Sequence, residues 1–150
     1  MPKKKVEETI QEEPKTIVKK GFISGTGRRK TAVARVFLYK EKGDFTVNDQ
    51  KIEDYFPTEK EQLNWMRPFH IVGVSHPSSK FSASIKVFGS GKPAQIGAIV
   101  HGLSRALTKV DPEWGKILSK EGFMTRDSRM VERKKPNLHK ARKATQYSKR

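Results

Sequence analysis

The basic C-terminal segment limits where this chain can build a hydrophobic core. Residues 126–150 contain ten basic and two acidic side chains. The apolar residues of this segment are few and scattered, namely Met130, Val131, Leu138, Ala141, Ala144 and Tyr147. So little apolar surface does not offset the conformational entropy lost when a segment becomes ordered. We therefore expect residues 126–150 to lack structure of their own, and the fold to be built from the residues before them.

The charge of the whole chain indicates a polyanionic partner. Its 150 residues hold 32 Lys and Arg against 16 Asp and Glu, giving a formal net charge of +16 and a pI of about 10.2. Self-repulsion on this scale opposes compaction unless a polyanion neutralises it. Nucleic acid is the first candidate and an anionic membrane surface the second. The sequence has neither a run of about 18 apolar residues nor a basic helix with a Trp and Leu face, so it favours nucleic acid and no membrane.

The rest of the composition predicts one domain with two appendages. Residues 1–20 mix Lys, Glu, Thr and Val without the apolar stretch of a cleavable leader, and we interpret them as a disordered extension with no assigned function. The chain has no Cys, which excludes disulfides, thiolate zinc sites and a Cys nucleophile and agrees with a reducing compartment. We divide the chain into a disordered extension at 1–20, an α/β RNA-binding core at 21–125 and a basic RNA-threading tail at 126–150.

Three segments have the composition of β-strands. Residues 31–40 are rich in β-branched and aromatic types and meet turn residues at 41–44, which predicts a hairpin with a return strand at 45–47 closed by Asn48-Asp49. Residues 81–88 alternate, with Phe81, Ala83, Ile85 and Val87 on one face. Phe22-Ile23 could add an edge strand.

The remaining core segments have helical signals. A helix can open at Pro57-Thr58 and end near Pro68. After residue 93 the apolar period becomes helical, at Ile96, Ile99, Val100, Leu103, Ala106, Leu107 and Val110. A second short helix over 113–120 would stop at Gly122. Strands alternating with helices predict an α/β fold, a small two-layer sandwich.

Two glycine-containing segments are candidate phosphate contacts. Gly89-Ser90-Gly91-Lys92 lacks the first Gly and the Ser or Thr of a nucleotide-binding loop, and what remains is a glycine turn into a helix N-terminus. We expect Gly89, Gly91 and Lys92 to contact an RNA phosphate there, and a plain tight turn is the alternative. In the run Gly25-Thr-Gly-Arg-Arg-Lys30, flexible glycines beside Arg28, Arg29 and Lys30 predict close approach of the backbone to a phosphate.

Other charged residues carry weaker signals. His101, Arg105 and Lys109 fall on the polar side of the helix after residue 93, and for Arg105 an RNA contact and a solvated face stay equally open. The four His residues lack metal-ligand spacing, and acidic pairs such as Glu53-Asp54 are ordinary solubilising surface. We therefore expect no catalytic residue, no metal and no cofactor.

Four ordered motifs resemble one known family. They are the run Gly-Phe-x-Thr-Arg-Asp-x-Arg-x-Val-Glu-Arg-Lys-Lys at 122–135, the terminal Ser-Lys-Arg, Gly-x-Gly-Arg-Arg-Lys-Thr-Ala-x-Ala-Arg-Val at 25–36, and the glycine turn with its helix. In that helix the matching residues are Gln95, Ala98, Gly102, Ser104, Arg105, Ala106 and Leu107. Over residues 21–150 the chain resembles small-subunit ribosomal protein nine of the bacterial and organellar type. Ser90 departs from the family pattern, where a glycine stands in the middle of the turn.

The resemblance implies a structural component of the small ribosomal subunit head that is not an enzyme. It implies a mixed sheet with a left-handed βαβ crossover, binding to the 3′ major region of the ribosomal RNA, neighbouring head proteins as partners, and location on a cytoplasmic bacterial ribosome or an organellar one. Ser148, Lys149 and Arg150 would approach the peptidyl-site transfer RNA. The tail cations expected to bind ribosomal RNA are Arg126, Arg129, Arg133, Lys134, Lys135, Lys140, Arg142 and Lys143.

Two other classes stay open on the residues alone. One is a basic enzyme component such as the protein subunit of ribonuclease P, and the other is a DNA-compacting architectural protein.

Overall fold

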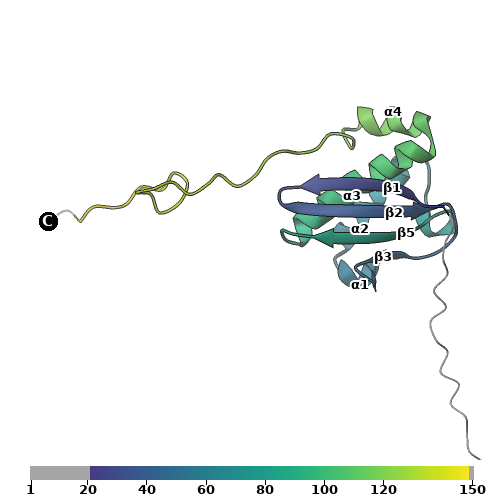
Figure 1. Cartoon of the computed structure of the whole chain (residues 1–150), viewed down its shortest axis with the longest axis horizontal. Helices are drawn as coiled ribbons and strands as arrows, with labels where there is room; N and C mark the ends of the chain where they lie inside the picture. The colour runs from purple at the N-terminus through teal and green to yellow at the C-terminus, as the bar shows by residue number, and fades with distance from the viewer. Residues whose placement is uncertain (1–20, 149–150) are drawn as a thin grey trace, which may run out of the picture.

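The computed structural model describes residues 21–148, and the extension expected at 1–20 lies outside them. The strands are β1 (Ile23–Arg29), β2 (Ala32–Tyr39), β3 (Phe45–Val47), β4 (Gln50–Lys51) and β5 (Ser82–Phe88). The helices are α1 (Ile52–Tyr55), α2 (Glu59–Ile71), α3 (Lys92–Val110) and α4 (Pro112–Lys120), with a 3-10 turn at Pro77–Ser79. Strands and helices form two layers, so the expected α/β sandwich is confirmed (Figure 1).

The five strands form one mixed sheet in the order β1-β2-β5-β3-β4. The expected hairpin between β2 and β3 is wrong, because β5 lies between them and pairs with both. β5 has an alternating apolar face at Ala83, Ile85 and Val87, and its central place in the sheet buries this face under the helices while both of its edges are paired. The hairpin that does form joins β3 to β4, and its turn residues Asn48 and Asp49 have φ of 48° and 67°. Positive φ at both central residues is the geometry of the tightest hairpin turns.

The connection from β3 to β5 is a left-handed crossover. It passes through α1 and α2, and β3 runs parallel to β5. In Figure 1 the helices lie behind the sheet, β5 lies above β3, and the arrow of β5 points to the left. This arrangement has the opposite hand to nearly all βαβ connections. It agrees with the crossover implied by the family resemblance.

The α2 helix begins where the sequence indicates but ends later. Thr58 is its N-cap, as expected, and the helix continues past Pro68 to Ile71. Pro68 is buried with Trp65 and Phe69 in the core, where Phe45 packs against both aromatic rings. Burial of this apolar face outweighs the one helical hydrogen bond that proline cannot donate.

Glycines let α3 lie directly on β1. A Cβ atom at Gly27 would collide with the carbonyl oxygen of Ala98, and one at Gly25 with that of Gly102. Gly25 and Gly27 are buried against the helix. The expectation that these glycines bring the backbone close to a phosphate is therefore wrong, because their missing side chains are needed for helix–strand packing.

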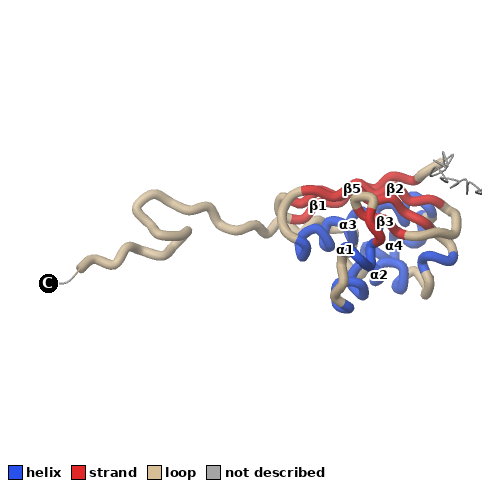
Figure 2. The backbone as a smooth tube through the Cα atoms, turned by 90° about the horizontal axis from the view of Figure 1, so that it is seen from below, coloured by secondary structure: helices blue, strands red, loops and turns tan. Residues whose placement is uncertain are grey.

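The α4 helix ends in a glycine cap, as predicted. Gly122 has a φ of +79°, the N–H of Phe123 donates to the carbonyl of Leu118, and the N–H of Gly122 donates to that of Ser119. This is the Schellman pattern. The cap turns the chain out of the core, and residues 126–148 then run away from the sheet without a named helix or strand in the described range (Figure 2).

Candidate nucleic-acid interface

Two turns that are far apart in the sequence meet at one end of the sheet. Gly89, with a φ of +80°, lies so close to the β1–β2 turn that a Cβ atom there would be 2.5 Å from the carbonyl oxygen of Thr31. Lys30, in the same β1–β2 turn, has a φ of 50°. The predicted cationic run and the predicted glycine turn therefore lie side by side. We call this region the basic end, and its members are Arg28, Arg29, Lys30, Gly89, Gly91, Lys92 and Arg126.

The tail begins at the basic end. Arg29 packs against Gly97 of α3, and its Nη1 lies 2.6 Å from an Oδ1 of Asp127. A shallow hollow is lined there by Arg28, Arg29, Gly97, Val100, His101, Gly122, Phe123, Thr125, Arg126 and Asp127. Phe123 and Met124 pack against the hydrophobic core just before it. The tail cations thus continue the positive surface of β1 instead of starting a separate one.

The glycine turn offers fewer free amides than its sequence indicates. Gly91 is the N-cap of α3, and the N–H groups of Ala94 and Gln95 already donate to its carbonyl. Pro93 has no N–H. Ser90 adopts a φ of 53°, so the serine in place of the family's glycine keeps the left-handed turn. The phosphate contact predicted at this helix end would therefore depend mainly on Lys92, whose Nζ lies 5.5 Å from the centre of the Tyr55 ring.

The polar side of α3 covers the free edge of β1. The Arg105 Nη1 donates to the carbonyl of Thr26 at 2.7 Å, and the Lys109 Nζ donates to that of Ser24 at 2.6 Å. These bonds satisfy carbonyl groups that an edge strand would leave open. Arg105 stays exposed, so its RNA contact remains a prediction, but the structure gives it a role in the fold as well.

His101 belongs to this edge and escaped prediction from the sequence. Its Nδ1 accepts a hydrogen bond from the backbone N–H of Arg28 at 3.3 Å. Burial first, and then the positive charges of Arg105 and Arg126, lower the pKa of His101 below its ordinary value. A neutral ring is needed for Nδ1 to accept this bond. The only sequence signal was the spacing of four residues from Arg105.

Asp127 also escaped prediction, although it organises two arginines. Besides Arg29, it binds Arg129 through a pair of contacts, with the Arg129 Nη2 2.8 Å from one carboxylate oxygen. Hydrogen bonds from the side chain and backbone of Arg129 hold the pKa of Asp127 well below its usual range. The signal in the sequence was an acid inside Arg-Asp-Ser-Arg, an otherwise cationic run.

The other tail cations differ in what they contact. Glu132 forms ion pairs with Lys135 at 2.9 Å and with Arg142 at 2.8 Å, and hydrogen bonds from these two cations lower the pKa of Glu132. These pairs and a bridge between Leu138 and Ala144 bend the tail back on itself. Within residues 126–148, the cations with exposed side chains and no ion pair are Arg126, Arg133, Lys134, Lys140 and Lys143. Ser148 is exposed, whereas Lys149 and Arg150 lie outside the described residues.

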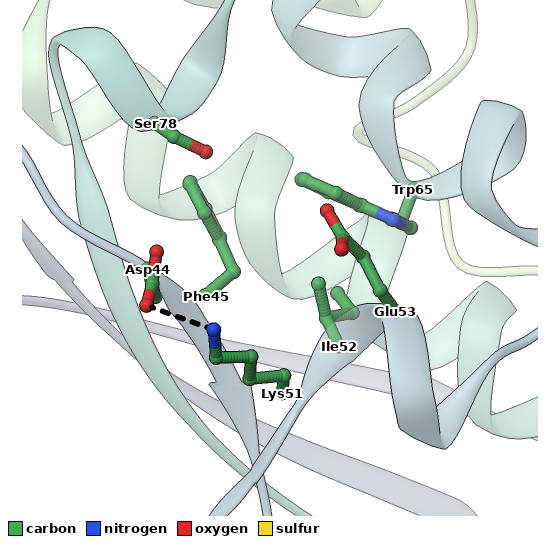
Figure 3. A pocket seen from close by; sticks show the side chains of 7 residues that line it. All are labelled: Asp44, Phe45, Lys51, Ile52, Glu53, Trp65 and Ser78. Carbon is green, nitrogen blue, oxygen red and sulfur yellow. Dashed lines mark ion pairs between the residues drawn. The ribbon is translucent and has the colours of Figure 1, made fainter.

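A second hollow lies away from the basic end, beside α1 and α2. Figure 3 shows its lining side chains, Asp44, Phe45, Lys51, Ile52, Glu53, Trp65 and Ser78. Lys51 pairs with Asp44 at 3.8 Å, which leaves the carboxylate of Glu53 as the dominant charge. A negative lining repels a polyanion, so this hollow is not a candidate phosphate site. Across residues 21–148, no group of His, Asp and Glu could hold a metal ion and no helix could span a membrane.

One comparison with known proteins bears on this arrangement. A family model described as Ribosomal protein S9/S16 matches residues 27–150. The match covers Arg28, Arg29 and Lys30, the glycine turn, α3 and the whole tail.

Proposed function

Because the chain belongs to the ribosomal protein S9/S16 family, we propose that it binds the 3′ major region of the small-subunit RNA in the head of that subunit. Family membership makes the chain a structural ribosomal protein that binds ribosomal RNA. The proposal adds the position, and with it contacts to neighbouring head proteins. The proposal also states that the chain is not an enzyme. It places the chain on a bacterial or an organellar ribosome.

The observation that carries the proposal is that the cationic tail starts at the basic end of the sheet, which is itself cationic. The Arg29–Asp127 ion pair joins the basic end of the sheet to the first residues of the tail. RNA that contacts Arg28 and Lys30 would therefore lie next to Arg126. The tail could then run along that RNA. Phosphate contacts of this kind fix the register of a protein on RNA.

The tail acts by becoming ordered on RNA. Beyond Asp127 its described cations are exposed, and each phosphate that they neutralise releases condensed counterions. Only in the presence of RNA do these contacts offset the conformational entropy lost when the tail becomes ordered. The tail would then hold surrounding RNA helices together, because its cations are spread along an extended segment (Figure 1).

The end of the tail is the proposed contact with transfer RNA. The described part of the tail ends at Ser148, and the end of the coloured trace is remote from the sheet (Figure 1). Lys149 and Arg150 follow it and would meet the anticodon stem-loop of the peptidyl-site transfer RNA. Support for this step comes from the matching terminal Ser-Lys-Arg alone.

Sedimentation through a sucrose gradient tests the central proposal. The tagged full-length chain, expressed in cells, should migrate with small subunits and remain with them after a wash at moderate salt. A chain without residues 126–150 should be lost in that wash, because half of the net charge is removed. Migration of the intact chain at the top of the gradient would refute the proposal.

A further inference from the structure

The face of the sheet opposite the helices is left open by residues 21–148 and carries aromatic side chains. All helices lie on one side of the sheet (Figure 2). Val36 and Leu38 of β2 face the helices and are fully buried, so Phe37 between them faces the other way. Phe22 contacts the Phe37 ring edge-on, with centroids 5.2 Å apart. Phe22 is 54% exposed and Phe88, at the end of β5, is 55% exposed.

In the described strands β1, β2 and β5, the same face is cationic and carries no acidic residue. Arg28, Arg35 and Lys86 alternate with buried residues of their strands, are exposed, and belong to this open face. None of the residues of β1, β2 and β5 is acidic. Leaving like charges side by side is unfavourable unless a polyanion covers them.

Strand register places cations and aromatic rings in adjacent rows. Arg28 is level with Val33, which is level with Phe88. Arg35 lies next along β2 and is level with Lys86. Successive rows on one face of a strand are separated by about 7 Å, twice the rise per residue. Apolar rings thus lie within one row of a positive charge.

We propose that this open sheet face binds unpaired RNA, with bases stacked on Phe22, Phe37 and Phe88. Phosphates are held by Arg28, Arg35 and Lys86. The inference rests on the proposed function and adds to it a second RNA surface on the sheet, which adjoins the basic end at Arg28 and does not include the tail. Aromatic side chains on an exposed sheet surface stack two or three bases in other small RNA-binding domains.

Unpaired RNA fits this face better than duplex RNA or protein. In a duplex the base faces are already stacked, so the rings would gain no partner. A protein partner would desolvate the three cations Arg28, Arg35 and Lys86, and it would have to supply acidic residues to pair with them. RNA supplies both a π-face and a phosphate from every nucleotide.

The test measures binding of the full-length chain to a short fluorescent unpaired RNA and to its duplex, by anisotropy over a series of salt concentrations. One variant combines Phe22→Ala with Phe88→Ala, and its matched control is Leu63→Ala on α2, a residue that is 58% exposed on the helical side. A rescue variant carries Tyr at positions 22 and 88. A charge variant combines Arg35→Gln with Lys86→Gln, and its control removes two exposed helix lysines, Lys60→Gln and Lys116→Gln.

The aromatic variant should bind unpaired RNA more weakly by roughly 5- to 150-fold per stacked base lost. Its log–log salt slope and its affinity for the duplex should stay those of the intact chain, and Tyr should restore binding. The charge variant should reduce the slope by about 1.4, or 0.7 for each single-strand contact, beyond its control. Photo-crosslinking to RNA containing 5-iodouridine should label peptides with Phe22, Phe37 or Phe88.

Equal affinity of the aromatic variant and the Leu63→Ala control would overturn this inference. So would an aromatic variant that keeps RNA affinity and instead loses a neighbouring ribosomal protein. The proposed function is read separately in the same titrations, because it requires the loss of affinity when residues 126–150 are removed. Loss of RNA binding by the sheet face and loss of RNA binding by the tail are therefore measured by different variants, and one result does not mask the other.

Discussion

Arg29 and Asp127 form an ion pair of 2.6 Å across 98 residues of sequence, and this pair marks where the tail leaves the core. Their side chains are 25% and 31% exposed, so water screens the attraction only in part. The preceding residues are also anchored: the Oγ1 of Thr108 donates to the Sδ of Met124, and Arg67 lies over the ring of Phe123. The first freely projecting residue is therefore Ser128, two residues later than the boundary drawn from composition.

Replacing Asp127 by Asn should release the root of the tail without unfolding the core. The amide keeps the shape but loses the charge that attracts Arg29 and Arg129. We expect faster backbone motion at residues 126–130 in nitrogen-15 relaxation and faster tryptic cleavage after Arg126, with little change in the thermal midpoint. Glu132→Gln, which removes an acid farther along the tail, is the matched control. Unchanged relaxation at residues 126–130 would contradict the anchoring role.

Gly27→Ala should destabilise the core strongly. The new methyl group would collide with the backbone of α3 at Ala98, so the helix must shift away from β1. Overpacking of this kind costs about 1–3 kcal/mol or more in the free energy of unfolding. Urea denaturation followed by circular dichroism measures it. Ser24→Ala, an exposed position on the same strand, should change stability by less than about 0.5 kcal/mol, and equal effects of both substitutions would refute the packing role.

Local patterns predicted the elements, and the failures came from contacts between distant segments. The alternation around Ile85 and the helical period around Leu103 each depend on one buried face, which a short window of sequence contains. The partner of Phe45 does not appear in such a window, and pairing with the nearest strand was wrong. Gly27 was misread for the same reason, because its partner Ala98 is 71 residues away.

The residues of the basic end, which are predicted to contact phosphate, lie together at one end of the fold, but the residues that bring them together were not predicted. Arg28, Arg29 and Lys30 could be recognised by charge alone. Asp127 contacts β1 at Arg29 and His101 accepts a hydrogen bond from Arg28, and an acid or a lone His has many ordinary explanations in a sequence. Their function depends on distances that only the folded chain defines.

His101 should make the stability of the core depend on pH below neutrality. Its pKa is lowered on folding, so the unfolded chain takes up a proton at a higher pH than the folded chain does. The stability linked to the neutral ring is complete above the unfolded pKa of about 6.5 and is lost as pH falls toward the folded value. His101→Asn, which keeps an acceptor for the N–H of Arg28, should flatten this slope in urea titrations between about pH 5 and 7.

His70 provides the control for that experiment. It lies exposed in the last turn of α2, away from β1. His70→Asn should leave the slope of stability against pH as it is in the intact chain. If the slope of stability against pH survived in His101→Asn and disappeared in His70→Asn, the pH dependence would come from His70. The role assigned to His101 would then be refuted.

Removing the tail should lower the salt dependence of RNA binding while the core stays folded. If the tail neutralises roughly six phosphates, its share of the log–log slope is about −5 in the duplex limit and shallower for single strands. Filter binding over a salt series measures the slope for chains ending at residue 125 or at residue 127. The longer chain keeps the Arg29–Asp127 pair, so it should also keep an ordered turn at Gly122. Melting of both truncated chains at room temperature would contradict a core that is independent of the tail.

Deleting Lys149 and Arg150 should separate assembly from transfer RNA binding. The deletion removes two of the ten cations in residues 126–150, so most phosphate contacts of the tail remain and the chain should still join small subunits at the normal level. Retention of transfer RNA in the peptidyl site should fall, because two charge-assisted contacts to its backbone are lost. Dissociation rates of labelled transfer RNA from purified subunits measure this. Lys134→Gln with Lys135→Gln removes the same charge nearer the core and should leave those rates unchanged; equal rates for the deleted and intact chains would refute a contact at the end of the tail.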